Sequence, residues 1–316
     1  MTAVSYPFPK ILIPYDGSQA AHKALEWAAH LVRAGGEAIE NVTLLRVIGG
    51  GYLARHLHNV DLRVTHMDEV SAWRRMRQHH LDQEILPLLE EGKRSLQDKG
   101  VGANIETKVA EGKIGEEIIR LADKGGYNAI VIGRRGLSPV KGMLLGSVTR
   151  RVLSLAQKVT VFLVGEGAAF NSESPVTPLL LPVDGSEPSL AAVRQGAALA
   201  QGFMAGHSSL SLLYVIDVTK VTAALGEASS LVHEGEEILT DSHAMVLKAG
   251  FEGEVEDKFR VGDPPRVIAE EAEKGNYALI LMGARGLSPV KQLILGSVSN
   301  EVLHRVSRLV VGIVYL

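Results

Sequence analysis

The sequence predicts an α/β protein built from two tandem copies of one open-sheet sandwich, each with a five-stranded parallel sheet and helices on both faces. Residues 127–149 and 277–299 align without a gap and are identical at 14 of 23 positions, so the chain contains an internal duplication. Short apolar runs alternate with stretches of helical spacing, which is typical of parallel β-α-β units. The length of 316 residues suits two domains.

Each strand and helix is expected from the spacing of its apolar residues. Five apolar runs per copy are too short for helices and stop at turn residues, so we interpret them as buried strands. These runs lie within residues 10–18, 42–48, 104–112, 129–133 and 159–164 and within residues 178–186, 210–216, 254–262, 279–283 and 309–315. Helical spacing predicts helices at residues 20–34, 116–124, 148–156, 189–203 and 266–274. Ser18 and Ser186 are expected to cap the first helix of each copy.

The duplication divides the chain into two domains. We predict a first domain over residues 1–165 and a second over residues 178–316, joined by a linker at residues 166–177 that is small, polar and ends in prolines. The two Asp-Gly-Ser motifs lie 168 residues apart, whereas the aligned glycine-rich segments lie 150 residues apart. The first copy therefore carries 18 additional residues, between about 49 and 92.

Composition excludes several classes of function. The formal net charge is −3, so no overall basic field favours nucleic acid. The absence of cysteine excludes disulfides, thiol catalysis and thiolate metal sites. The N-terminal residues lack the apolar core of a signal peptide, and no apolar run approaches the roughly 20 residues of a membrane helix. We expect a soluble, cytoplasmic protein that binds neither nucleic acid nor membrane.

Both copies repeat one glycine frame, defined here as the pattern Gly-x2-Gly-x9-Gly-Ser between a strand and a helix. The frames comprise Gly133, Gly136, Gly146 and Ser147, and Gly283, Gly286, Gly296 and Ser297. Backbone N–H groups at such a bend, together with a helix N-terminus and a hydroxyl group, suit a phosphate. The alternative is a tight loop that needs glycine for its own φ values, and two copies of the frame weaken that alternative.

Polar residues at the expected carboxyl ends of the strands extend this site. Open parallel sheets bind ligands beyond these ends, where Asp16 and Asp184 follow the first strand of each copy. Their carboxylates could accept a hydrogen bond from a base amino group or a ribose hydroxyl; the alternative is an Asx-turn or a helix cap. Four basic residues within the frames could neutralise phosphates or be solvated loop charges. They are Arg135, Lys141, Arg285 and Lys291.

The glycine frame, joined to an early strand that ends in Pro-x-Asp-Gly-Ser, resembles the universal stress protein family in both halves of the chain. Similarity to its ATP-binding branch implies a parallel sheet of order 3-2-1-4-5 that binds ATP or ADP over the strand ends, with Mg²⁺ or Mn²⁺ near the phosphates. The resemblance also implies that the last strands, at residues 159–164 and 309–315, pair within the chain as a built-in pseudo-dimer. A further homodimer is left open.

Carried over position by position, the resemblance names two sets of ten binding residues. In the first copy they are Pro14, Tyr15, Asp16, Val47, Ile132, Gly133, Gly136, Gly146, Ser147 and Val148. In the second copy they are Pro182, Val183, Asp184, Val215, Met282, Gly283, Gly286, Gly296, Ser297 and Val298. Tyr15 departs from the small aliphatic residue usual at its position, and we expect it either to stack on the base or to crowd it. The second copy is closer to the plain pattern.

Other patterns carry less weight. Residues 49–54 fit the dinucleotide spacing G-x-G-x-x-A but do not open a convincing helix. His56, His58, His66, His79 and His80 match no closed set of metal ligands, and the surrounding segment could equally be a solvated, partly helical arm or a partner surface. No nucleophile–base pair lies within the repeated motifs. We therefore expect a nucleotide-binding sensor or regulator, with a scaffold of empty sites and a slow ATPase as the alternatives.

Overall fold

The computed structural model describes residues 6–50, 74–136, 145–168, 174–203, 208–218, 228–286 and 295–316. The elements of the first copy are β1 (Lys10–Pro14), α1 (Gln19–Gly35), β2 (Asn41–Ile48), α4 (Leu86–Asp98), β3 (Ile105–Glu111), α5 (Ile114–Gly125), β4 (Ala129–Gly133), α6 (Ser147–Leu155) and β5 (Thr160–Val164). The elements of the second copy are β6 (Leu179–Val183), α7 (Glu187–Gln201), β7 (Ser209–Asp217), α9 (Ala228–Lys248), β8 (Glu254–Gly262), α10 (Pro264–Lys274), β9 (Leu279–Gly283), α11 (Ser297–Arg305) and β10 (Val310–Val314). The α/β fold class is confirmed.

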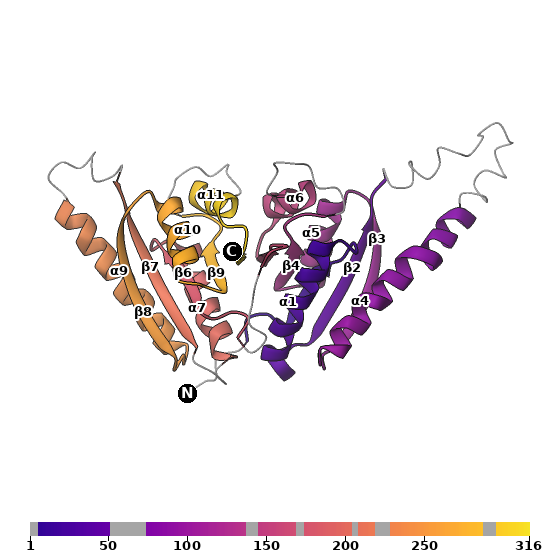
Figure 1. Cartoon of the computed structure of the whole chain (residues 1–316), viewed down its shortest axis with the longest axis horizontal. Helices are drawn as coiled ribbons and strands as arrows, with labels where there is room; N and C mark the ends of the chain where they lie inside the picture. Colours follow the sequence, from indigo (N-terminus) through magenta and orange to yellow (C-terminus); the bar gives the residue numbers. More distant parts are fainter. Residues whose placement is uncertain are drawn as a thin grey trace.

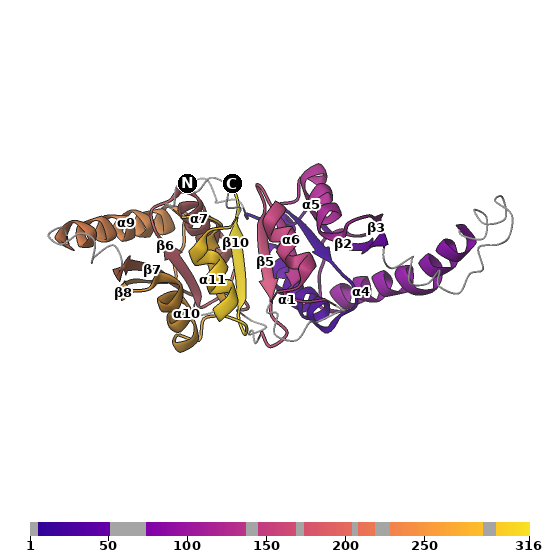
Figure 2. The same cartoon turned by 90° about the horizontal axis from the view of Figure 1, so that it is seen from above.

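The strands form one continuous sheet, in which two five-stranded halves are joined through their last strands. Its order is β3-β2-β1-β4-β5-β10-β9-β6-β7-β8, so each half keeps the expected order 3-2-1-4-5. The halves join where β5 pairs antiparallel with β10, with Val311 opposite Leu163 and Val314 opposite Thr160 (Figure 2). The physical reason is that β5 and β10 are the inner edge strands of their halves, and pairing them satisfies backbone groups that an edge leaves open.

Helices cover both faces of the sheet and enclose two cores. One core lies under α1, α4, α7 and α9, and the other lies under α5, α6, α10 and α11 (Figure 1). Each core contains buried residues from both halves of the chain. Alternate residues of β1 enter opposite cores: Ile11 and Ile13 pack in the first core, and Leu12 packs in the second. The two halves therefore share their apolar interior across the seam between β5 and β10.

The sequence analysis placed neither α4 nor α9, although both are regular helices. These helices flank the sheet at its two outer ends (Figure 1). Only Leu89, Gly92 and Leu96 of α4 are buried, so its apolar stripe is narrow. Most of its residues are polar or exposed, and the sequence pattern therefore indicated a solvated segment. Helical residues also precede α4, at 74–80 and in a π-helical turn at Leu81–Ile85, which agrees with the partly helical arm considered for this segment.

Polar contacts tie the halves together around the seam. Thr160 on β5 donates a hydrogen bond from Oγ1 to Oε1 of Gln195 on α7, at 2.6 Å. Trp27 on α1 is fully buried, lies 4.8 Å from the ring of Phe162, and donates from Nε1 to the carbonyl of Pro175, which precedes β6. A buried indole N–H needs such a partner, so this bond fixes the path of the chain into the second half. None of the helices in the described ranges combines the length and apolar character that a bilayer crossing requires.

Candidate functional site

The Asp-Gly-Ser turns lie directly beyond β1 and β6. Gly185 adopts φ 78°, a left-handed conformation that favours glycine, and a Cβ there would lie 3.0 Å from Cδ1 of Ile238. Ser186 caps α7 as expected, because its Oγ accepts the N–H of Ser189. Oδ1 of Asp184 accepts the N–H of Ser186 at 3.0 Å and its hydroxyl at 2.6 Å. The Asx-turn alternative is thus part of the structure, and it uses one carboxylate oxygen.

The second oxygen of each aspartate faces the middle glycine of the frame. A Cβ on Gly136 would lie 2.8 Å from Oδ2 of Asp16, and a Cβ on Gly286 would collide with Oδ2 of Asp184. The tertiary structure therefore brings the two motifs of each copy into direct contact, although about 100 residues separate them in the sequence. Glycine is required here because a carboxylate occupies the place of its side chain.

The third glycine of each frame begins the following helix. Gly296 is the N-cap of α11, and its N–H donates to the carbonyl of Ala284 at 2.7 Å; the N–H of Gly146 donates to the carbonyl of Arg134 at the same distance. These bonds close the loop and place the N-termini of α6 and α11 at the strand ends. The first N–H groups of a helix have no partner within it, so they point toward this region.

The first glycine of each frame has a packing role. A Cβ on Gly133 would lie 2.8 Å from backbone atoms of Ala20, and a Cβ on Gly283 would lie 2.7 Å from the carbonyl carbon of Pro188. Glycine there is required by the close approach of α1 and α7, whereas the sequence analysis explained it by phosphate approach. None of the six frame glycines is among the described residues with positive φ, so the alternative based on φ is wrong.

The second half contains a cavity of about 460 Å³ at the carboxyl ends of its strands. All ten residues predicted for this half line it: Pro182, Val183, Asp184, Val215, Met282, Gly283, Gly286, Gly296, Ser297 and Val298. The remaining lining residues are Ser189, Leu213, Tyr214, Asp217, Glu234, Pro264, Ile268, Arg285 and Ser299. Sequence reasoning missed Glu234, although the 150-residue offset places Glu84 at the same position of the first copy.

The cavity is acidic on one side. Asp184 follows β6, Asp217 ends β7 and Glu234 belongs to α9. Arg285 follows β9, and the N-terminus of α11 comes after it in the chain. Burial raises the pKa of Tyr214 above its usual range, and the carboxylates of Glu234 and Asp184 raise it further. Such a lining suits a ligand with hydrogen-bond donors at one end and an anion at the other.

The ten predicted residues of the first half occupy the corresponding strand ends and helix start. The side chain of Tyr15 is 2% exposed and packs in the core under α1 and α4, as does that of its counterpart Val183, which is 4% exposed. Its hydroxyl lies 2.9 Å from Nδ1 of His22, and a Cβ on Gly92 would lie 3.0 Å from its Cε1. The expectation that Tyr15 stacks on or crowds a base stays a prediction, since Val183, which packs in the same core, lines the cavity of the second half.

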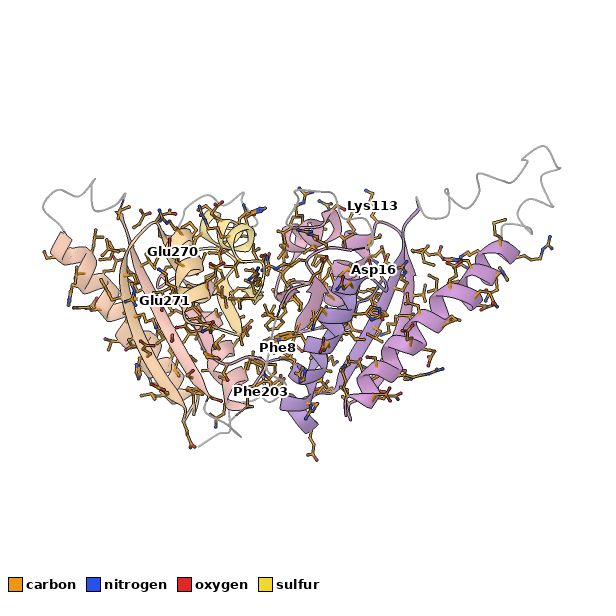
Figure 3. All side chains as sticks on the ribbon, viewed as in Figure 1. Phe8, Asp16, Lys113, Phe203, Glu270 and Glu271 are labelled. Atoms are coloured by element: carbon orange, nitrogen blue, oxygen red, sulfur yellow. The ribbon has the colours of Figure 1, made fainter. Side chains whose placement is uncertain are left out.

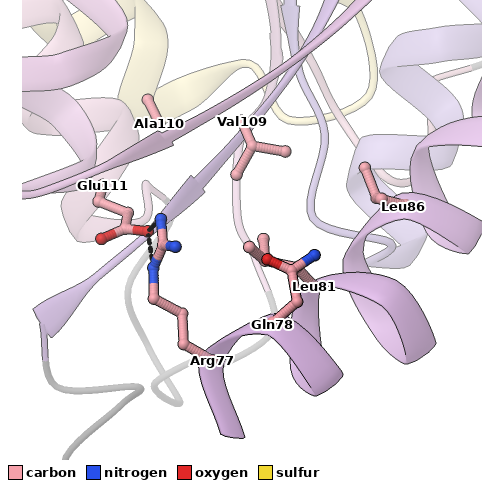
Figure 4. Close-up of a pocket in the computed structure, with 7 residues that line it drawn as sticks. All are labelled: Arg77, Gln78, Leu81, Leu86, Val109, Ala110 and Glu111. Carbon is pink, nitrogen blue, oxygen red and sulfur yellow. Dashed lines mark hydrogen bonds and ion pairs between the residues drawn. The ribbon is translucent and has the colours of Figure 1, made fainter. Parts of the chain in front are cut away.

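A separate hollow of about 440 Å³ lies at the outer edge of the first half, between β3 and the helical residues before α4 (Figure 4). Nε of Arg77 donates to Oε1 of Glu111 at 2.6 Å across it. Leu81, Leu86 and Val109 line its apolar side. It contains none of the ten residues predicted for the first half.

Several predicted features lie outside the described residues. This group comprises Lys141, Lys291, the histidines at 56, 58 and 66 and most of the dinucleotide spacing. Within the described ranges, no group of three or more His, Cys, Asp or Glu residues could hold a metal ion. Two of the five histidines considered as metal ligands, His79 and His80, are described. Nδ1 of His80 lies 3.3 Å from the carboxylate of Glu84.

Comparisons with known proteins agree with the duplication. The family model described as "Universal stress protein family" matches residues 7–164 and again residues 176–311. Universal stress protein Slr1230 of Synechocystis sp. PCC 6803 is 28% identical over 317 residues, covering 94% of this chain and 96% of its own. Universal stress protein YxiE of Bacillus subtilis is 33% identical over 159 residues, covering 47% of this chain and 94% of its own.

A solved structure shares the whole fold. The crystal structure of a universal stress protein from Archaeoglobus fulgidus DSM 4304 has a TM-score of 0.66 and 23% identity. The match covers 97% of this chain and 98% of the archaeal chain, so the arrangement of both halves is common to the two proteins.

Proposed function

Because the chain belongs to the universal stress protein family, we propose that it is a stress-response regulator or sensor that binds ATP or ADP in its second half. One observation carries this proposal: ten residues named from the sequence line a single cavity of about 460 Å³ at the strand ends. A cavity of this size lies within the range of small-ligand sites. Three glycines, a helix start and an aspartate meet there, although no single segment of the sequence contains them.

Each part of the lining has a role in this proposal. The carboxylate of Asp184 accepts hydrogen bonds from the base or the ribose, and the backbone of Val215 pairs with the adenine edge. Gly286, Gly296 and Ser297 present N–H groups and a hydroxyl to the phosphates at the N-terminus of α11. Mg²⁺ or Mn²⁺ is proposed to bind through the phosphates, since oxygen atoms are the preferred ligands of Mg²⁺.

The first half is proposed to offer a second site of the same design. Asp16, Gly136 and Gly146 have the same mutual contacts as their counterparts in the second half. We take residues 1–165 and 178–316 as the two domains, with residues 166–177 as the linker. The antiparallel pair of β5 and β10 then serves as the interface of a pseudo-dimer within one chain.

Nucleotide content and affinity test the proposal. The purified protein should retain adenine nucleotide, and titration calorimetry with ATP, ADP and GTP should show binding of the adenine nucleotides only. Gly286→Leu places a side chain against Asp184 and inside the cavity, so it should abolish binding to the second half. Gly136→Leu is the matched control, which makes the same change in the first half. Absence of adenine nucleotide binding in the wild type, or unchanged binding in Gly286→Leu, would refute the proposal.

A further inference from the structure

Two side chains cross the seam between the halves and bond to the same carbonyl position of opposite helices. Nη1 of Arg134, which follows β4, donates to the carbonyl of Leu303 on α11 at 2.8 Å. The hydroxyl of Tyr315, which follows β10, donates to the carbonyl of Leu153 on α6 at 2.7 Å. Leu153 and Leu303 correspond to each other under the 150-residue offset of the duplication.

These carbonyls belong to the last turns of the two helices that begin at the glycine frames. The carbonyls of Val152 and Val302 accept the N–H groups of Ala156 and Val306. The last carbonyls of a helix find no N–H donor within the helix, so they are open to donors from elsewhere. Each helix thus starts at the candidate site of its own half and is bonded near its end by a side chain of the other half. With nine residues, each helix is about 14 Å long and connects the two regions as one rigid element.

The two donors do not arise from equivalent positions. Arg134 corresponds to Ala284, and Tyr315 corresponds to Gly165. A Cβ on Gly165 would collide with the carbonyl of Ser307 and would lie 3.8 Å from Cδ of Arg134. Each half therefore has one long side chain and one small residue at this pair of positions, and the two crossed contacts are made from different positions.

The contact of Arg134 buries a charged side chain without satisfying all of its hydrogen-bond donors. The side chain is 4% exposed, and its Nε and Nη2 have no hydrogen-bond partner among the described residues. Burial lowers the pKa of Arg134 to about 10, so the guanidinium stays charged at neutral pH. Replacing a buried charge by an apolar side chain of similar size is often neutral or stabilising, so global stability gives a weak reason for an arginine here.

We propose that Arg134 and Tyr315 are positioning residues that orient the phosphate-facing helix of the opposite half, so that ligand affinity in each half depends on a side chain from the other. A cation near the C-terminal end of α11 also complements the helix dipole. This inference rests on the proposed function, because it concerns affinity at the sites proposed above.

A crossed pair of variants tests this inference on the full chain. Arg134→Met should weaken ADP binding to the second half three- to tenfold and leave the first half unchanged, and Tyr315→Phe should do the reverse. Gly136→Leu and Gly286→Leu backgrounds isolate the second and the first site, respectively. Arg308→Met removes an exposed charge after α11 and should change neither affinity. Unchanged affinities in both crossed variants, or equal losses at both sites, would overturn the proposal.

Hydrogen exchange of the ligand-free protein separates this inference from the proposed function. Arg134→Met should accelerate exchange in a peptide covering α11 without affecting α6, and Tyr315→Phe should accelerate exchange in α6 alone. Both variants should keep the melting temperature of the wild type within a few degrees. Failure of the wild type to bind ADP refutes the proposed function, whereas an unchanged exchange pattern refutes the positioning role of the crossed contacts.

Discussion

The ring of Tyr214 lies against Gly235 of α9, where a Cβ would come within 2.6 Å of the ring carbon Cδ1. Phe259 bounds the same space, since its Cε2 would lie 2.7 Å from that Cβ. In the first half, Arg46 stands at the position of Tyr214 and Ile85 at the position of Gly235. There the ring of Tyr15 packs against Gly92 instead. Each half thus packs one tyrosine ring against a helical glycine, but at different places, and Tyr214 lines the cavity of the second half.

Gly235→Ala should destabilise the protein although alanine is the better helix former. The helix propensity favours alanine by about 1 kcal/mol, but overpacking against two rings costs about 1–3 kcal/mol. Urea denaturation measures the difference in the free energy of unfolding. In the Tyr214→Leu background one of the two rings is absent, so Gly235→Ala should cost less stability there than in the wild type, with Phe259 still limiting the space. A stabilised Gly235→Ala protein would contradict overpacking at this position.

Asp184→Asn and Asp184→Ala should distinguish the role of Asp184 in the turn from its role in ligand binding. Asparagine retains an oxygen that accepts from the N–H and hydroxyl of Ser186, so the free energy of unfolding should change by less than about 1 kcal/mol. Alanine loses both bonds and should cost about 1–2 kcal/mol. Both variants remove the charge and should weaken ADP binding at least tenfold in calorimetry. Equal affinity of Asp184→Asn and the wild type would exclude a binding role for this carboxylate.

Ser297 and Ser299 lie two residues apart but should respond differently to alanine. Ser299 is 4% exposed and donates from Oγ to the carbonyl of Gly283 at 2.8 Å, so Ser299→Ala should lower the free energy of unfolding by about 1–2 kcal/mol. Ser297 is exposed at the start of α11, so Ser297→Ala should leave stability unchanged and weaken ADP binding several-fold. Thermal melts and calorimetry measure the two effects, and a reversed pattern would contradict the assignment of these hydroxyls.

Tyr15 should make the folded state sensitive to alkaline pH. Burial raises its pKa to about 12, and the carboxylates of Glu91 and Asp16 contribute. The unfolded chain releases this proton near pH 10, so stability from a neutral Tyr15 is complete below pH 10 and is lost as the pH rises toward 12. Denaturation between pH 9 and 12 should show a steeper loss in the wild type than in Tyr15→Phe. Identical slopes would mean that Tyr15 ionises freely in the folded protein.

The contrast between Tyr15 and Asp16 shows how far sequence reasoning reaches. Both follow the same strand and both were assigned to the site, but side chains of a strand alternate between its two faces. Asp16 lies beyond the end of β1 (Figure 3), and its Oδ2 faces Gly136. The hydroxyl of Tyr15 lies 2.9 Å from Nδ1 of His22. The family pattern gives the position of residue 15, whereas the packing of its large ring depends on the space that Gly92 leaves for it.

Local pattern determined the buried strands, the capped helices and the glycine frames by itself, because periodicity and turn chemistry act between near neighbours. The ten residues that line one cavity came from the family resemblance that these patterns carry. The tertiary structure alone decided that Tyr214 and Glu234 reach the cavity and that Arg134 and Tyr315 cross the seam. These relationships join residues that are distant in the chain, and they depend on the volume and hydrogen-bond partners that only the packed fold provides.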